Sequence, residues 1–135
     1  MTVRFIKEIM PINIDAEEAI LGGILIDPMA INRVANILRP EALAITVHQH
    51  IYRAALALYS KEQPTDLMNV TTFLADHNLL EVVGGESKLV MLAARTVSAV
   101  NIDQYALLVV DKFVRRELIK VGNDLCSLDT KLPPN

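Results

Sequence analysis

The stretch LLEVVGGESKLVML, residues 79–92, combines two glycines with a serine and a lysine, which are residue types found in phosphate-binding loops. A P-loop follows the pattern G-x-x-x-x-G-K-[ST]: its backbone amides surround the phosphates and its lysine directly follows the last glycine. Here Glu86 and Ser87 separate Gly85 from Lys88, and an apolar residue stands where the magnesium-binding hydroxyl belongs. The stretch therefore predicts a turn between two helices, with glycines at positive φ angles, rather than a phosphate site.

Three histidines could serve as ligands of a metal ion. His48 and His50 are two positions apart on an expected helix, so their side chains point to different faces and do not meet at one ion. His77 falls at an expected helix end, where histidine commonly faces solvent or the last carbonyl groups. The spacing of the histidines therefore predicts no metal site.

Asp15, Glu17 and Glu18 form an acidic cluster at the start of an expected helix. Carboxylates suit this place because they cap the helix and face the positive end of its dipole, with Asp15 as the N-cap and Glu18 three residues later. Contact with a partner protein is a second role that these acids could combine with capping. Cys126 is the single cysteine, which excludes an intrachain disulfide and fits a reducing compartment. We expect no catalytic residue and no cofactor.

The length and composition indicate one domain with a core of its own. The chain has 135 residues, of which 52% are hydrophobic and 21% charged. A formal net charge of −3 and a pI near 5.5 lack the basic excess of a nucleic-acid-binding module, so we expect weak DNA binding at most. The longest apolar run is far shorter than the roughly 20 residues of a membrane span. We expect a protein of the cytoplasm or plastid stroma, without membrane contact.

The fold class predicted from apolar spacing and helix-capping residues is all-α: a compact multi-helix head followed by a long C-terminal helix. Gly22 and Gly23 each cost a helix about 1 kcal/mol relative to alanine, which indicates close approach of another helix. The helices are expected at about 15–27, 28–38, 47–61, 67–77, 86–96 and 101–127. The predicted organisation is a flexible segment at 1–13, the head at 14–100, the long helix at 101–127 and a flexible tail at 128–135.

The long helix carries an apolar seam with steps of 3, 4, 4, 3 and 4 residues. This spacing suits packing along another helix, either in the domain's own core or in a second copy. Because no helix follows it in the chain, we expect partial exposure and self-association through the seam. The basic residues Lys112, Arg115, Arg116 and Lys120 lie mostly off it, as a solvated face or a contact for an acidic partner. The seam residues are Leu107, Val110, Val114, Leu118, Val121 and Leu125.

Six segments occur in an order that resembles a known family: DAEEAILGGILIDP, RPEAL, HQHIYRAALAL, PTDLMNVTTFL, LLEVVGGESKL and TVSAVNIDQYALLVVDKFVRRELI. Together they resemble the N-terminal domain of the bacterial replicative DNA helicase family DnaB, most closely its cyanobacterial or plastid members. The resemblance runs over residues 14–123. It implies a helical head followed by a helical hairpin, of which residues 102–125 match the first helix.

The resemblance also implies a non-catalytic role in DNA replication. In this family hairpins pair between subunits, six domains form a collar as a trimer of dimers, and primase docks on the collar through its C-terminal domain. A helicase loader is a further candidate partner. The second hairpin helix and the RecA-like motor domain, which binds ATP and Mg²⁺, have no counterpart here. The matching primase-docking candidates are Asp15, Lys88, Arg116, Ile119 and Leu125; Lys88 replaces a residue that is often aromatic in the family.

Two alternative functions, each from a different class of protein, remain open. One is a small helical enzyme or ligand-binding domain that uses a pocket between helices, with Cys126 or a histidine at work. The other is a helical DNA-binding regulator, against which the acidic pI argues.

Overall fold

The structure is a computed structural model that describes residues 10–131. Every regular element in this range is helical, which confirms the predicted all-α class. The α-helices are α2 (Ile14–Ile26), α3 (Thr46–Ser60), α4 (Leu67–Asp76), α5 (Gly85–Arg95) and α6 (Ile102–Lys131), and two short 3₁₀ helices are η1 (Ala30–Arg33) and η2 (Pro40–Ala42).

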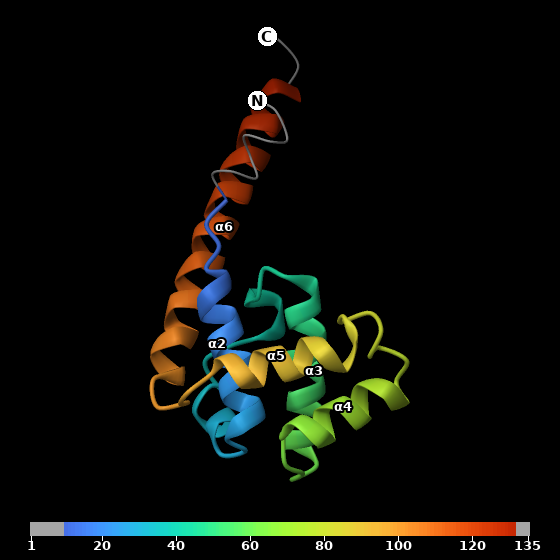
Figure 1. Cartoon of the computed structure of the whole chain (residues 1–135). Coiled ribbons are helices and arrows are strands. Elements are labelled where there is room, and N and C mark those ends of the chain that lie inside the picture. Colours follow the sequence, from blue (N-terminus) through green and yellow to red (C-terminus); the bar gives the residue numbers. More distant parts are fainter. Residues whose placement is uncertain (1–9, 132–135) are drawn as a thin grey trace.

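Helices α2 to α5 form a head, and α6 extends away from it as a rod (Figure 1). Helix α2 is the central element because it packs against α3, α4, α5 and α6. Its residues Ile20, Leu21 and Ile24 are almost completely buried, as the centre of the core should be. The residues just before α2 run beside α6, so two segments far apart in sequence meet there (Figure 1).

The predicted bounds of the helices near 47–61, 67–77 and 86–96 agree with α3, α4 and α5 within one residue. The start of α2 differs from the prediction, since the N-cap is Asn13 and not Asp15. The Oδ1 atom of Asn13 accepts a hydrogen bond of 3.0 Å from the amide of Ala16. Asp15 instead lies in the first turn of α2, where its charge still faces the positive end of the helix dipole.

The prediction of one α-helix over 28–38 is wrong. This segment contains only η1 and successive turns, with short-range bonds such as Val34 N to Ile31 O at 3.2 Å. Asp27 starts the segment, because its Oδ1 accepts from the Met29 amide at 3.0 Å. Ala30, Ile31, Val34 and Leu38 are all buried, and a tighter, irregular path lets this short stretch place them in the core.

The glycines inside α2 are explained by close packing, as predicted, although the contacts come mainly from the segment joining α5 to α6. A Cβ atom on Gly22 would collide with the Thr96 side chain and with the carbonyl of Leu92 at the end of α5. A Cβ atom on Gly23 would press on Ala99 and on Ile102 at the start of α6. The glycine pair thus lets the α5–α6 connection cross directly over α2.

The fully buried residues of helix α6 all lie in its first part. Ile102, Ala106 and Val109 are buried at a spacing of four and three residues, a stripe that the sequence analysis did not identify. The helix continues to Lys131, four residues past the predicted end at 127. Of the segments predicted to be flexible, residues 1–9 and 132–135 lie outside the described part of the chain.

Candidate functional site

The stretch with two glycines forms a helix-to-helix turn, as predicted. Gly84 and Gly85 have φ angles of 104° and 77°, in the region that favours glycine, and α5 begins at Gly85. Lys88 Nζ lies 3.1 Å from Glu18 Oε2, so this lysine links α5 to α2 through an ion pair. Its charge is therefore already partly compensated within the head.

Glu18 is the centre of a charged cluster between α2 and α5. Its Oε1 atom lies 3.7 Å from Arg95 NH1, while its Oε2 atom binds Lys88. Asp15 lies on the same face of α2, about one turn earlier, and is exposed. The acids of the cluster thus have more than a capping role, since Glu18 connects two helices.

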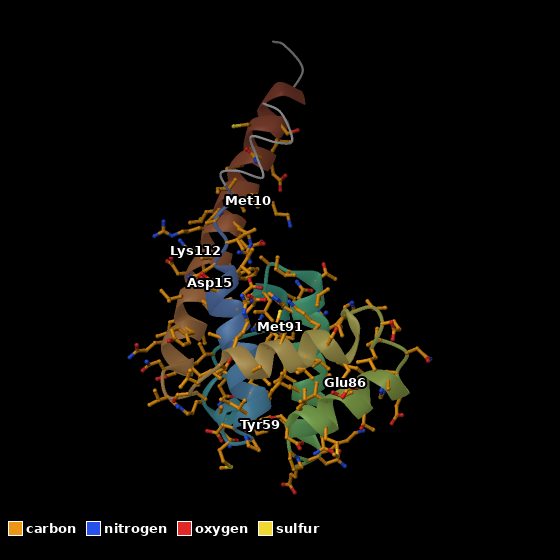
Figure 2. The ribbon with its side chains drawn as sticks, in the orientation of Figure 1. Met10, Asp15, Tyr59, Glu86, Met91 and Lys112 are labelled. Atoms are coloured by element: carbon orange, nitrogen blue, oxygen red, sulfur yellow. The ribbon has the colours of Figure 1, made fainter. Side chains whose placement is uncertain are left out.

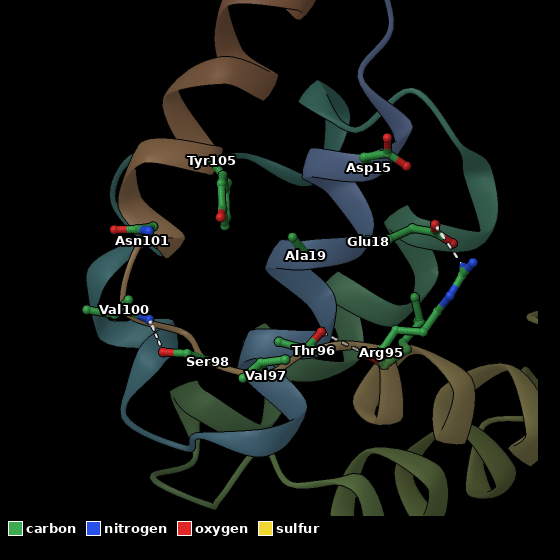
Figure 3. Close-up of a pocket in the computed structure, with 11 residues that line it drawn as sticks. Asp15, Glu18, Ala19, Arg95, Thr96, Val97, Ser98, Val100, Asn101 and Tyr105 are labelled. Carbon is green, nitrogen blue, oxygen red and sulfur yellow. Dashed lines mark hydrogen bonds and ion pairs between the residues drawn. The ribbon is translucent and has the colours of Figure 1, made fainter.

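A pocket of about 380 Å³ opens beside this cluster. It lies between α2 on one side and the 96–101 segment with the start of α6 on the other (Figure 3). Asp15 and Glu18 line it together with Arg95 and the ring of Tyr105, so a partner would meet charge and apolar surface side by side. The fully exposed Val97 adds apolar surface to its rim.

The apolar seam predicted on α6 is largely on the surface. Val110 is the exception, because it is half-buried against the core of the head. The other five side chains are between 47% and 67% exposed, which is unusual for a row of aliphatic residues. We call these five residues the α6 stripe: Leu107, Val114, Leu118, Val121 and Leu125. They lie along α6, whose distal part extends beyond the head in Figure 2.

Arg116 is held by the head instead of extending into solvent. Its NH1 atom donates to the carbonyl of Pro11 at 2.9 Å, and its NH2 atom donates to the carbonyl of Ala42 at 2.7 Å. The guanidinium carbon also lies 5.8 Å from the centre of the Phe113 ring. Its neighbour Arg115 forms an i,i+4 ion pair with Asp111 at 3.0 Å on the exposed side of the helix.

The five primase-docking candidates fall into two groups. Asp15 and Lys88 belong to the α2–α5 cluster, where Glu18 lies between them. Arg116, the half-buried Ile119 and the exposed Leu125 lie on α6. The N-terminal segment connects the groups, because Arg116 binds the carbonyl of Pro11, four residues before Asp15.

A buried pair, Glu17 and His48, was missed by sequence reasoning. Both residues are buried, and His48 Nδ1 lies 2.8 Å from Glu17 Oε1. Glu17 also accepts from the amides of Ala44 at 2.8 Å and Ile45 at 3.4 Å, just before α3 begins at Thr46. Glu17 therefore stabilises the start of α3 rather than of its own helix. Because Glu17 stands among the polar residues at the start of a helix, its sequence position indicated capping and not this long-range contact.

The cysteine and histidines that were candidates for an enzymatic role do not converge on the pocket. Cys126 is exposed on the distal part of α6, His48 is buried with Glu17, and His77 Nδ1 lies 2.8 Å from the carbonyl of Phe73. Within residues 10–131, no group of three or more histidine, cysteine or acidic side chains is arranged to hold a metal ion. The same range contains no helix long and apolar enough to cross a membrane.

Comparison with known protein families identifies the family of this chain. Residues 9–111 match the family described as the DnaB-like helicase N terminal domain, so the chain belongs to this family. The matched part is a helical, non-catalytic domain, and the helicase motor domain is not among these 135 residues. The resemblance noted from six sequence segments is thereby confirmed.

The chain is similar to replicative DNA helicases DnaB from two cyanobacteria. It is 56% identical to the protein of Nostoc sp. and 50% identical to that of Synechocystis sp., each over 118 residues and 87% of this chain. The aligned part spans only 13% and 14% of those proteins. The crystal structure of the N-terminal domain of DnaB helicase from Mycobacterium tuberculosis matches with a TM-score of 0.88 and 32% identity, covering 91% of this chain and 89% of the other.

Proposed function

We propose that this domain assembles with copies of itself into the collar of a replicative DNA helicase, and that the collar docks primase during DNA replication. The domain performs no chemistry in this proposal: ATP and Mg²⁺ act in a motor domain, and DNA is bound mainly elsewhere. The cytoplasm or the plastid stroma is the proposed compartment, because the relatives are replicative helicases of cyanobacteria.

The exposed α6 stripe is the observation that carries the assembly half of the proposal. Five aliphatic side chains, each at least 47% exposed, lie at helical spacing along the rod that α6 forms. Complete burial of an exposed aliphatic side chain contributes roughly 1.5–3 kcal/mol. Since the stripe side chains are 47–67% exposed, pairing of two stripes buries the remaining part of each and favours association. Helices with this spacing pair side by side, and the charged residues beside the stripe, such as Asp111 and Arg115, favour one register over others.

The substitution Leu118→Glu tests the assembly half. Leu118 is 67% exposed in the middle of the stripe, so the change leaves the head intact but places a charge in the paired interface. We expect self-association to weaken about tenfold or more, the effect of 1.4 kcal/mol or more. Sedimentation equilibrium of both proteins measures this constant.

Met68→Glu is the matched control, because Met68 is 75% exposed on α4 and away from the rod. It introduces the same charge and should leave association unchanged. If the wild type associates and Leu118→Glu does so equally well, the stripe is not the interface.

The α2–α5 cluster supports the docking half. It places an exposed acid, Asp15, at the edge of a pocket that also has apolar surface from Val97 and Tyr105. A partner helix with a basic residue beside an apolar one fits this combination of charge and shape. Lys88 differs from an aromatic residue at this position, since its ammonium group is paired with Glu18.

Titration with the C-terminal domain of the cognate primase tests docking. Asp15→Lys should weaken binding about tenfold or more, because like charges facing each other in an interface are unfavourable by several kcal/mol. Asp76→Lys, the same charge change at the exposed end of α4, is the control and should have no effect. Absence of binding even to the full-length helicase would refute the partner proposal.

A further inference from the structure

The direction of α6 relative to the head decides where the α6 stripe points. The helix has 30 residues, and at 1.5 Å per residue it is about 45 Å long. Its buried residues, Ile102, Ala106 and Val109, lie within the first eight positions. Because only the first part of this long helix is fully buried, a small change in the angle between α6 and the head moves the distal end of α6 a long way. The contacts that fix this angle therefore matter for assembly.

Two arginines connect α6 to the head at separate points along the helix. At its base, Arg33 donates to the carbonyls of Ala99 at 3.1 Å and Val100 at 2.6 Å, and it pairs with Asp103 at 2.7 Å. Half-way along, Arg116 reaches back from α6 to the head. At 1.5 Å per residue, Arg116 is about 20 Å from the start of the helix, and it lies about one turn beyond Phe113, which still packs against the core.

The two carbonyls that Arg116 binds belong to different segments. Pro11 lies in the extended residues before α2, and Ala42 is the last residue of η2, where a helix leaves its carbonyl groups without helical partners. A planar guanidinium has separate N–H groups that donate to two acceptors at once, whereas an ammonium is a single point of charge. Packing against the Phe113 ring further restricts the side chain.

We propose that Arg116 is a positioning residue that fixes the angle between α6 and the head by joining α6 to both the N-terminal segment and η2. This clamp presents the α6 stripe in one direction. The consequence for assembly rests on the proposed function, whereas the clamp itself is a property of one chain. Arg116 therefore influences partners through the direction of the helix, even where it does not touch them.

A distance measurement between α6 and the head tests the clamp directly. Cys126 is the single cysteine and is exposed on the distal part of α6, so a nitroxide label attaches there without removing other thiols. A second label at Met68→Cys reports from α4. Pulsed electron paramagnetic resonance on labelled protein diluted with unlabelled protein then gives the distance distribution within one chain.

Arg116→Met keeps the length of the stem but removes both hydrogen bonds, so we expect a distribution clearly wider than that of the wild type or shifted from it. Arg115→Met is the matched control: it removes the adjacent charge, whose partner Asp111 is on α6 itself, and should leave the distribution unchanged. An unchanged distribution in Arg116→Met overturns the proposal. If that variant unfolds the head, the distance distribution of Arg116→Lys provides the same test. A single ammonium group does not reproduce the two hydrogen bonds that the guanidinium group donates to separate carbonyls.

Sedimentation of the same variants separates this proposal from the assembly proposal. We expect Arg116→Met to weaken self-association about tenfold relative to the wild type, the effect of 1.4 kcal/mol. A wider distance distribution with unchanged association would retain the clamp but overturn its role in assembly. A wild-type protein that does not associate would refute the assembly function, while the distance measurement would still decide the clamp.

Discussion

Long-range contacts of single polar side chains stabilise the ends of the head's helices. Thr65 donates to the carbonyl of Ile24 at 3.0 Å, in the last turn of α2, and Glu17 accepts from two amides before α3. Among the described residues, no buried side-chain nitrogen or oxygen lacks a hydrogen-bond partner. An unpaired group of this kind is unfavourable by roughly 1–3 kcal/mol, so each contact fixes the relative position of two segments.

Tyr52 gives a prediction about pH. Its hydroxyl is buried and donates to the carbonyl of Leu38 at 2.7 Å. Burial raises the pKa of Tyr52 above its usual value of 10.0, because the phenolate would lose its hydration. The unfolded chain therefore releases this proton at a lower pH than the folded protein. The contribution of Tyr52 to the free energy of unfolding should be complete below pH 10 and should decrease as the pH rises above it.

Tyr52→Phe isolates this contribution, since phenylalanine keeps the ring but leaves the Leu38 carbonyl unpaired. At neutral pH we expect the variant to be less stable by about 1 kcal/mol. Urea denaturation of both proteins between pH 8 and 11 measures the difference, which should shrink at the alkaline end. A difference that grows with pH would contradict the assigned direction of the pKa shift.

At the scale of elements, the crossing of the α5–α6 connection over α2 depends on Gly22. Gly22→Ala should lower the free energy of unfolding although alanine favours a helix by about 1 kcal/mol, because the new Cβ meets the Leu92 backbone as well as the Thr96 side chain. Gly122→Ala on α6 is the control, since no atom lies within 4 Å of its new Cβ, and it should increase helicity. Chemical denaturation followed by circular dichroism measures both; a stabilising Gly22→Ala would contradict the close crossing.

Helices with strong periodicity could be predicted from the sequence, whereas contacts between distant segments could not. The apolar spacing of 51, 54, 55 and 58 predicted α3 within one residue. The same reasoning failed at 28–38, where the structure has η1 and successive turns although Ala30, Ile31, Val34 and Leu38 are buried at a spacing that a helix would also allow. It also assigned Glu17 to helix capping, because nothing local indicates that residues 44 and 45 come within 3.4 Å of its carboxylate.

For the candidate binding surface on α6, too, the periodic pattern could be predicted from the sequence and the contacts with distant segments could not. The α6 seam was visible as a periodic pattern, and five of its six residues are exposed. Sequence spacing could not show that Val110 packs on the head, because that depends on which side of α6 meets α2. Nor could it show that Arg116 binds two carbonyls from residues 11 and 42.

At the scale of the whole molecule, the chain combines a packed head with a rod that has few buried contacts. The first part of α6 shares the core through Ile102, Ala106 and Val109, whereas the five stripe residues are exposed. Isolated helices shorter than roughly 12–15 residues are marginal in water, so the distal part of α6 should open more easily than the head.

Amide hydrogen exchange tests this difference. In dilute protein we expect amides of residues 118–131 to exchange at least about tenfold faster than those of 106–113, because local opening there requires little loss of buried surface. Raising the protein concentration should slow exchange at 118–131 selectively, since pairing of α6 stripes stabilises the folded helix by mass action. Leu118→Glu should remove this concentration dependence without changing exchange in the head. Equal protection along α6 in dilute protein would show that contacts other than self-association stabilise the distal helix.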